Sequence, residues 1–379
     1  MRRVCIIALA FFLLGAATAR AELPADTLKA AVLPTPPGPH WVYLVDMGFA
    51  HMTEGRIILV NGDRKDVLGM VTTGFLAGVA HSPDHKELYV TETFYARGTR
   101  GERTDVMTIY RTDELKPIGE VIIPNKRFIA VTMPYGTVTT PDGRFLLQFN
   151  YTPATSVSVV DLKNRSFAGE IATPGCYLMY PAASSRAFSM ICSDGKLLTV
   201  KLDESGRPVT QTMSGAPFFD PDKESLNVAP ARVHHTLLFV SFHGVVHPLD
   251  LATDTPVVEK PWPLLAAKDK ARSWRPGGWQ YVAADDKLGR LYVAMHRGKD
   301  GSHKDPGTEI WVYNLKTHAR IQRIRAKTPV VSLLTSRDDH PLLYALGAGG
   351  DLHVYDAATG RYRGSLDHAA ETAMVMVNP

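Results

Sequence analysis

The chain has 379 residues, of which 45% are apolar and 21% are charged, and its formal net charge is +4. This length and composition are sufficient for a large folded core, and they exclude a disordered or a collagen-like chain. The basic residues are scattered through the sequence and form no stripe. The charge pattern therefore gives no indication of nucleic-acid binding.

The first 21 residues have the organisation of a secretory signal peptide. Arg2 and Arg3 precede an uncharged apolar run from Val4 to Thr18, and Ala19-Arg20-Ala21 forms a small-x-small cleavage site. The run is too short to span a bilayer, which needs about 20 residues, although an uncleaved anchor is the alternative. We expect cleavage after Ala21 and export to the periplasm. Removing the three arginines lowers the formal net charge from +4 to +1, and no later segment is apolar for long enough to enter a membrane.

After a short, proline-rich leader at residues 22–40, the sequence repeats, and we expect a single domain over residues 41–379. An apolar strand that ends at a polar or charged residue and a turn occurs seven times, at spacings of 40 to 64 residues. The strand ends are Asn61, Arg111, Asp161, Lys201, Asp250, Asn314 and Asp356. A second short strand, such as Leu88-Tyr89-Val90, lies ahead of each one.

Four short strands in each repeat of this length are typical of a propeller blade. A blade can bury its two apolar faces only against neighbouring blades, and a closed ring leaves no end blade exposed. We therefore predict an all-β, seven-bladed β-propeller with four-stranded antiparallel blades. Two packed β-sandwiches with irregular loops are the alternative. Helical periodicity is weak, and the best helix candidate is Leu264–Ser273.

Cys176 and Cys192 remain after the signal peptide, which contains Cys5, is removed. An even pair in an oxidising compartment indicates a disulfide. Apolar runs flank the turn Pro181–Arg186, and a hairpin that turns there places the two cysteines opposite each other. Two free thiols are the alternative.

Motifs that carry catalytic chemistry are absent from the sequence. There is no G-x-S-x-G nucleophile elbow, no phosphate-binding loop, no C-x-x-C and no H-E-x-x-H. His243 and His247 are four residues apart, which on a strand separates them by about 13 Å, too far for a chelating pair. We therefore expect no metal site in this chain. From the residues alone, a binding scaffold is supported as well as an enzyme.

Several segments nevertheless resemble the heavy subunit of the quinoprotein amine dehydrogenases, the methylamine and aromatic amine dehydrogenase heavy chain family. The similar segments run from residue 38 to residue 377. They are Trp41–Gly69, Arg97–Asp105 (RGTRGERTD), Thr140–Gly143, Pro153–Asp161, the two cysteine segments, Trp274–Gln280 (WRPGGWQ) and Glu309–Val312 (EIWV). PATS, EIWV and LLAAKDKARSW look closer to the aromatic amine type.

The resemblance implies a seven-bladed propeller of the YVTN or quinoprotein amine dehydrogenase type. It implies a light subunit that carries tryptophan tryptophylquinone, a heterotetramer of two heavy and two light subunits, and an amicyanin- or azurin-type blue copper protein as electron acceptor. A primary amine would be oxidised to aldehyde and ammonia. This chain would supply no catalytic residue, would bind no cofactor and would be inactive alone. Family members often carry a longer arm than residues 22–40, which puts the tetramer in doubt.

The resemblance also assigns Phe49 to the wall of the substrate channel, and packing within a blade is the alternative for this residue. Phe94, Tyr95 and Tyr135 are weaker candidates for the channel or the subunit interface, and core or rim packing is favoured for them. A periplasmic propeller that binds a ligand or protein without a quinone partner is the alternative function. A hydrolase or lyase with its site in the central channel is the least favoured.

Overall fold

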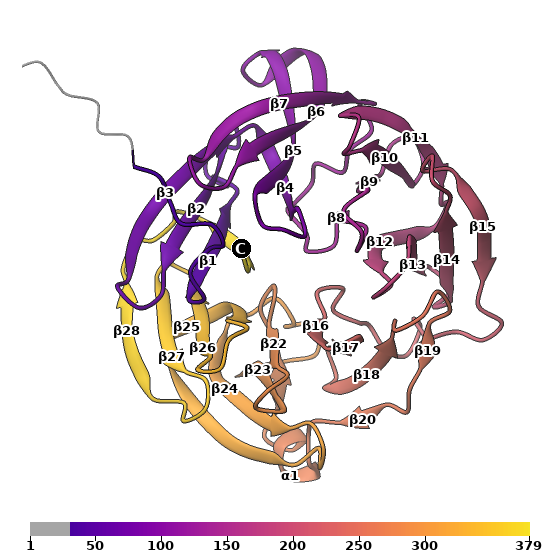
Figure 1. Ribbon diagram of the computed structural model, residues 1–379. Coiled ribbons are helices and arrows are strands. Elements are labelled where there is room, and N and C mark those ends of the chain that lie inside the picture. Colours follow the sequence, from indigo (N-terminus) through magenta and orange to yellow (C-terminus); the bar gives the residue numbers. More distant parts are fainter. Residues whose placement is uncertain (1–30) are drawn as a thin grey trace, which may run out of the picture. The chain divides into compact units, whose positions relative to one another are not determined.

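The structure is a computed structural model that describes residues 31–379, of which Leu33–Pro379 form one compact unit. The predicted signal peptide at residues 1–21, its cleavage site and the first part of the leader lie outside the described residues. Within residues 31–379 the strands form six antiparallel sheets, arranged in a ring around a central axis (Figure 1). In the same part of the chain, no helix combines the length and apolarity needed to span a bilayer.

Five of the sheets are blades with a path of four strands. The first contains β29 (Ala373–Val377), β1 (Trp41–Asp46), β2 (Gly55–Asn61) and β3 (Asp66–Thr73). The second contains β4 (Phe75–His81), β5 (Glu87–Arg97), β6 (Arg100–Arg111) and β7 (Lys116–Ile123). The third contains β8 (Thr137–Thr139), β9 (Phe145–Asn150), β10 (Ser156–Asp161) and β11 (Ser166–Ala172).

The next two blades follow the same antiparallel order. The fourth contains β12 (Cys176–Pro181), β13 (Ala187–Cys192), β14 (Leu197–Leu202) and β15 (Pro208–Met213). The fifth contains β16 (Ala231–Val233), β17 (Thr236–Val240), β18 (Val245–Asp250) and β19 (Val257–Val258), and β20 (Trp262–Pro263) also pairs with β18.

The remaining strands form one eight-stranded sheet. It contains β21 (Trp274–Pro276), β22 (Val282–Asp285), β23 (Arg290–Arg297), β24 (Gly307–Asn314), β25 (Arg320–Thr335), β26 (Leu342–Gly347), β27 (Leu352–Asp356) and β28 (Tyr362–Leu366). The expected helix at 264–273 is reduced to the four residues of α1 (Ala267–Lys270).

The prediction of seven separate four-stranded blades is therefore wrong. Five blades have the predicted four-stranded path, but the last two sequence repeats share the eight-stranded sheet. The cause is the 16-residue strand β25, which pairs with β24 through Arg320–Arg325 and with β26 through Val330–Thr335. The chain passes between the two repeats in extended conformation, so the hydrogen-bonded ladder continues where the sequence repeat predicts a break.

The sequence of each strand reflects its depth in the ring. Inner strands such as β1, β9 and β26 are buried at every position, because each of their two faces packs against a neighbouring sheet. The outermost strand β15 is exposed at all six positions. Strands rich in β-branched and aromatic residues thus lie inside, and polar strands lie at the rim.

The ring closes by strand pairing between distant parts of the chain. β29, the last strand, pairs with β1, the first, and Tyr43 lies opposite Val377. The chain thereby completes the first blade with its last strand, and the inner edge of β1 is paired.

The predicted disulfide between Cys176 and Cys192 is confirmed. The two residues are directly opposite in the β12–β13 ladder, and the hairpin turns at residues 182–186. Their sequence separation is 16. A closed loop of this size stabilises the fold by about 3 kcal/mol in the chain-entropy model.

A charged contact reinforces the closure. His40 Nδ1 lies 2.7 Å from Asp63 Oδ2, and its Nε2 lies 3.2 Å from both Asp338 Oδ1 and the His340 carbonyl oxygen. Both ring nitrogens therefore face acceptors, and only the doubly protonated imidazolium can donate from both. Burial lowers the pKa of His40, but the hydrogen bond with Asp63 and the charge of Asp338 outweigh it, so the pKa is raised.

We predict that this contact makes stability depend on pH. Because the pKa of His40 is higher in the folded state, its contribution is fully present below its unfolded value of about 6.5 and is lost as the pH rises through the folded value. His40→Gln should lower the melting temperature more at pH 5.5 than at pH 9. His235→Gln, whose ring makes no hydrogen bond or ion pair with residues 31–379, is the control. A pH-independent effect of His40→Gln would contradict the prediction.

Candidate functional site

Alternate connections emerge on opposite faces of the ring, because neighbouring strands are antiparallel. We call the face that carries residues 47–54, 94–103 and 124–132 the loop face. The face that carries residues 62–65, 182–186 and 336–341 is the turn face. Binding residues are disproportionately found on loops that a rigid scaffold positions. The loop face has the longer connections, and it carries three of the four predicted aromatic candidates.

Phe49 lies on the loop face with 47% of its surface exposed. Its backbone is held firmly, because the buried carboxylate of Asp46 accepts hydrogen bonds from the backbone N–H groups of Gly48, Glu371 and Thr372. The Thr372 hydroxyl in turn accepts the N–H of Phe49 at 2.7 Å. An apolar ring thus projects from a fixed backbone into solvent. Its role as a channel residue stays a prediction.

Phe94 and Tyr95 lie at the end of β5, where the β5–β6 hairpin extends beyond the rest of its blade (Figure 1). Phe94 is 45% exposed. Tyr95 is partly buried and packs edge-on against Phe75, with ring centroids 5.4 Å apart. The structure therefore presents Phe94 to solvent and uses Tyr95 in local packing.

A buried network of charges holds the base of this hairpin. Asp105 is fully buried and accepts both Nε and Nη2 of Arg103, at 2.8 and 2.7 Å, together with the backbone N–H of Arg127 at 3.0 Å. The Arg127 guanidinium donates to the carbonyl oxygens of Phe75 and Leu76. Burial lowers the pKa of Arg127 to about 10, and the charge of Asp105 opposes this shift. Hairpin and loop are thereby fixed to one another.

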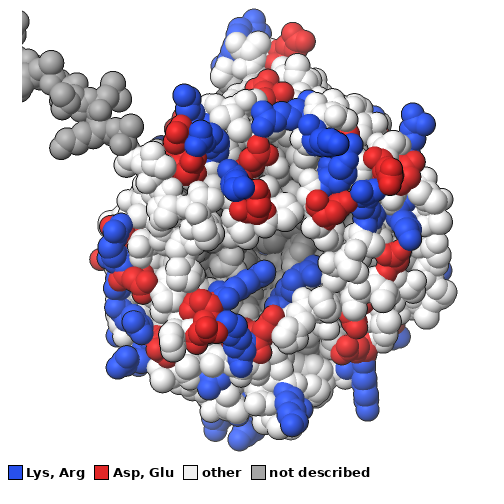
Figure 2. All heavy atoms as spheres, viewed as in Figure 1, with Lys and Arg blue, Asp and Glu red and all other residues white. Residues whose placement is uncertain are grey.

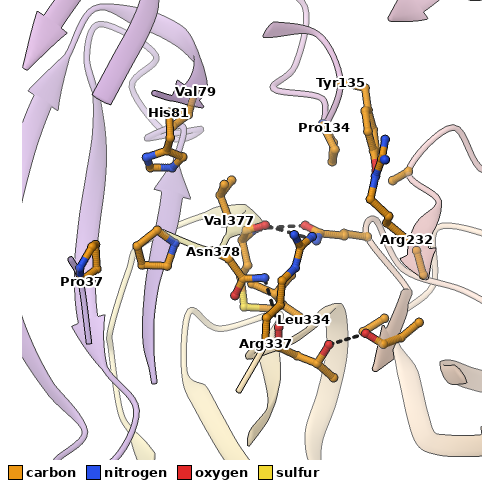
Figure 3. Close-up of a pocket in the computed structure, with 18 of the residues that line it drawn as sticks. Pro37, Val79, His81, Pro134, Tyr135, Arg232, Leu334, Arg337, Val377 and Asn378 are labelled. Carbon is orange, nitrogen blue, oxygen red and sulfur yellow. Dashed lines mark hydrogen bonds between the residues drawn. The ribbon is translucent and has the colours of Figure 1, made fainter. Parts of the chain in front are cut away.

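Tyr135 lies elsewhere. It packs against Tyr180, with centroids 5.0 Å apart, and lines a cavity of about 600 Å³ on the ring axis (Figure 3). The structure thus separates Tyr135 from the exposed aromatic residues of the loop face.

The WRPGGWQ segment contributes Gln280 to the lining of this cavity. Trp279 donates its indole N–H to the carbonyl oxygen of Thr132, and Gln280 exchanges two hydrogen bonds with the backbone of Met376. Gly278 has φ of +124°, and a Cβ there would lie 2.5 Å from the Val331 carbonyl oxygen. Only glycine permits this close approach.

Sequence reasoning missed the polar residues of the cavity and the buried charges beside the hairpin. The cavity residues are His81, Arg232 and Arg337, which come from three distant repeats. Their sequence signal is weak: His81 ends β4, Arg232 lies in the short strand β16, and Arg337 lies in the polar turn after β25. Within residues 31–379, no three His, Cys, Asp or Glu side chains gather closely enough to hold a metal ion. His243 pairs with Asp300 at 3.3 Å, and His247 is buried in β18.

These features define a β-propeller with exposed aromatic residues on its loop face and a cavity on its axis. The family model described as "Methylamine dehydrogenase heavy chain (MADH)" matches residues 39–378. The chain belongs to this methylamine dehydrogenase heavy chain family.

Two curated relatives bear the same description. The methylamine dehydrogenase heavy chain of Paracoccus versutus is 33% identical over 331 residues, covering 86% of this chain and 76% of the relative. That of Methylophilus methylotrophus is 30% identical over 329 residues, covering 86% and 80%.

Solved structures support the fold alone. A functionally unknown protein from Desulfotomaculum acetoxidans has a TM-score of 0.59 at 11% identity, covering 90% of this chain and 99% of its own. The dihydro-heme d1 dehydrogenase NirN, in complex with DHE, has a TM-score of 0.56 at 17% identity, covering 95% and 78%.

We predict that Asp105→Asn destabilises the fold by about 3 kcal/mol, because it leaves buried arginine charge without its partner. Guanidinium denaturation measures this loss. Asp113→Asn is the matched control: Asp113 pairs with the half-exposed Arg111, and such a pair contributes about 0–1 kcal/mol. Equal losses in the two variants would show that the Asp105 network is not a stability element.

Proposed function

We propose that this chain is the heavy subunit of a periplasmic, tryptophan tryptophylquinone-dependent amine dehydrogenase. The enzyme oxidises primary amines, methylamine or aromatic amines, to aldehyde and ammonia. The observation that carries the proposal is that the model of the methylamine dehydrogenase heavy chain family matches residues 39–378. The chain itself supplies a scaffold and a wall of the substrate channel.

The partner in this proposal is a light subunit, in a heterotetramer of two heavy and two light subunits. The quinone on that subunit accepts the electrons of the amine, and an amicyanin- or azurin-type blue copper protein receives them next. The loop face is the proposed docking surface, because it presents the exposed rings of Phe49 and Phe94. Exposed apolar side chains on ordered backbone are typical of protein interfaces.

Within the assembled enzyme, Phe49 has two tasks. Its apolar ring excludes water from the channel, and its bulk limits which amine side chains pass. The hydrogen bonds that the loop N–H groups donate to Asp46 and Thr372 fix the loop backbone, so the ring is positioned before the light subunit docks. Such preorganisation lowers the entropic cost of forming the interface.

Localisation in the periplasm is supported by two features. The N-terminal sequence ending at Ala21 has signal-peptide organisation. The Cys176–Cys192 disulfide is typical of an oxidising compartment.

We predict that the purified chain alone reduces no redox dye with methylamine or 2-phenylethylamine. Co-expression with its light subunit should give a complex with quinone absorbance and amine-dependent dye reduction. Dye reduction by the isolated chain would overturn the scaffold assignment. Purification of the chain from periplasm without any quinone-bearing partner would instead favour a propeller that acts as a binding protein.

We also predict that Phe49→Ala in the assembled enzyme changes amine preference. The ratio of kcat/KM for 2-phenylethylamine to that for methylamine should shift about tenfold, which corresponds to 1.4 kcal/mol of differential transition-state binding. Stability should change by no more than about 0.5 kcal/mol, as for other surface positions. Phe167→Ala, on the outer strand β11 and 38% exposed, should leave the ratio unchanged. An unaltered ratio in Phe49→Ala would remove Phe49 from the channel.

A further inference from the structure

The axial cavity has a volume of about 600 Å³ and lies at the turn-face end of the ring. Figure 2 shows the ring hollowed at its centre, with basic side chains projecting into the hollow. Most of the wall is apolar, with Val79, Pro134, Tyr135, Leu334 and Val377 among its residues (Figure 3). A volume of this size falls within the range of about 300–1,000 Å³ that holds small organic ligands.

Two arginines bring positive charge into this apolar cavity. Arg337 makes no hydrogen bond or ion pair through its guanidinium with any residue of 31–379. Arg232 makes one hydrogen bond there, to the carbonyl oxygen of Pro181 at 3.3 Å. A guanidinium carries five N–H donors, so most of the donors of both side chains are available to a ligand.

The acidic residue of the cavity does not neutralise these arginines. Asp338 accepts His40 Nε2 and the backbone N–H of His340 at Oδ1, and the Ser336 hydroxyl at Oδ2. Both of its oxygens are therefore engaged. Pro379 also lines the cavity. Within residues 31–379, no ion pair joins its terminal carboxylate to Arg232 or Arg337.

His81, on the opposite wall of the cavity (Figure 3), is a further polar side chain without a hydrogen-bond partner within residues 31–379. Neither ring nitrogen has a hydrogen-bond partner within residues 31–379, and both are buried. Burial, assisted by the neighbouring His85, lowers the pKa of His81 to about 3, so the ring is neutral at physiological pH. A buried donor or acceptor without a partner costs about 1–3 kcal/mol, and a polar group of a ligand or an ordered water removes that cost.

We propose that the axial cavity binds a small organic anion, a carboxylate on an apolar body. Its carboxylate accepts the N–H groups of Arg232 and Arg337, since guanidinium and carboxylate match in charge and planar geometry. The apolar body lies against Val79, Tyr135 and Leu334. An inorganic anion fits less well, because it leaves this apolar wall in contact with water. The proposal concerns a site distinct from the loop face and does not rest on the proposed function.

Isothermal titration of the full chain with phenylacetate tests the proposal. Arg232→Gln and Arg337→Gln should each weaken binding about tenfold or more, as expected for the loss of a charge-assisted hydrogen bond. Arg361→Gln, an exposed turn arginine outside the cavity, should bind like the wild type. Neutral phenylacetamide should bind at least about tenfold more weakly than phenylacetate, since it lacks the charge.

A second measurement does not depend on the variants. The Cε1–H resonance of His81 should move when phenylacetate is added to the wild-type chain and stay in place when inorganic phosphate is added. Absence of phenylacetate binding at about 10 mM, a concentration that detects even very weak binding, would overturn the proposal. Wild-type affinity in the Arg232→Gln/Arg337→Gln double variant would overturn it equally. If phosphate binds as tightly as phenylacetate, the apolar wall has no role and the organic-anion assignment is wrong.

Discussion

The structure depends on the burial of sheet faces that no single sheet can bury alone. Inner strands such as β9 and β26 are buried on both faces, so each sheet needs a neighbour on either side. A linear stack would leave two such faces in water, and the ring removes both. The pairing of β29 with β1 is the step that joins the ends, and it brings residue 377 beside residue 43. Loop lengths, rim polarity and the axial cavity are free to vary once this closure is made.

The sequence predicts those features that are encoded locally. The cysteine pair could be predicted because the hairpin turn lies midway between the two cysteines, so that strand pairing alone brings them together. The number of separate blades could not be predicted, because the sequence shows the repeats but not which strands are hydrogen-bonded to each other. β25 stays extended through the boundary between two repeats at Lys327–Pro329 and joins both repeats in one sheet. Leu264–Ser273 has helical composition, yet only Ala267–Lys270 is helical, where the chain crosses between β20 and β21.

The cavity shows why functional residues are harder to predict than strands. His81, Arg232 and Arg337 are more than a hundred residues apart in sequence, and each comes from a different repeat. They lie around one cavity only because the innermost strands of all repeats surround the same axis. Phe49 is different, since its exposure follows from a local loop that Asp46 holds at the end of β1. A resemblance at the level of family motifs can therefore indicate Phe49 but gives no information on the axis.

The segment at Gly278–Gln280 connects these two parts of the molecule. Its Gln280 lines the axial cavity, and the segment is hydrogen-bonded to Thr132 of the loop face, to Val331 and to Met376 of β29. Phe49 is on that same loop face, and the Thr132 N–H in turn contacts the sulfur of Met47 at the start of the Phe49 loop. The segment therefore provides a hydrogen-bonded path from the wall of the cavity to the loop face. Because Gly278 admits no side chain beside Val331, the segment has little freedom to shift, and the two ends of the axis are expected to act as independent sites.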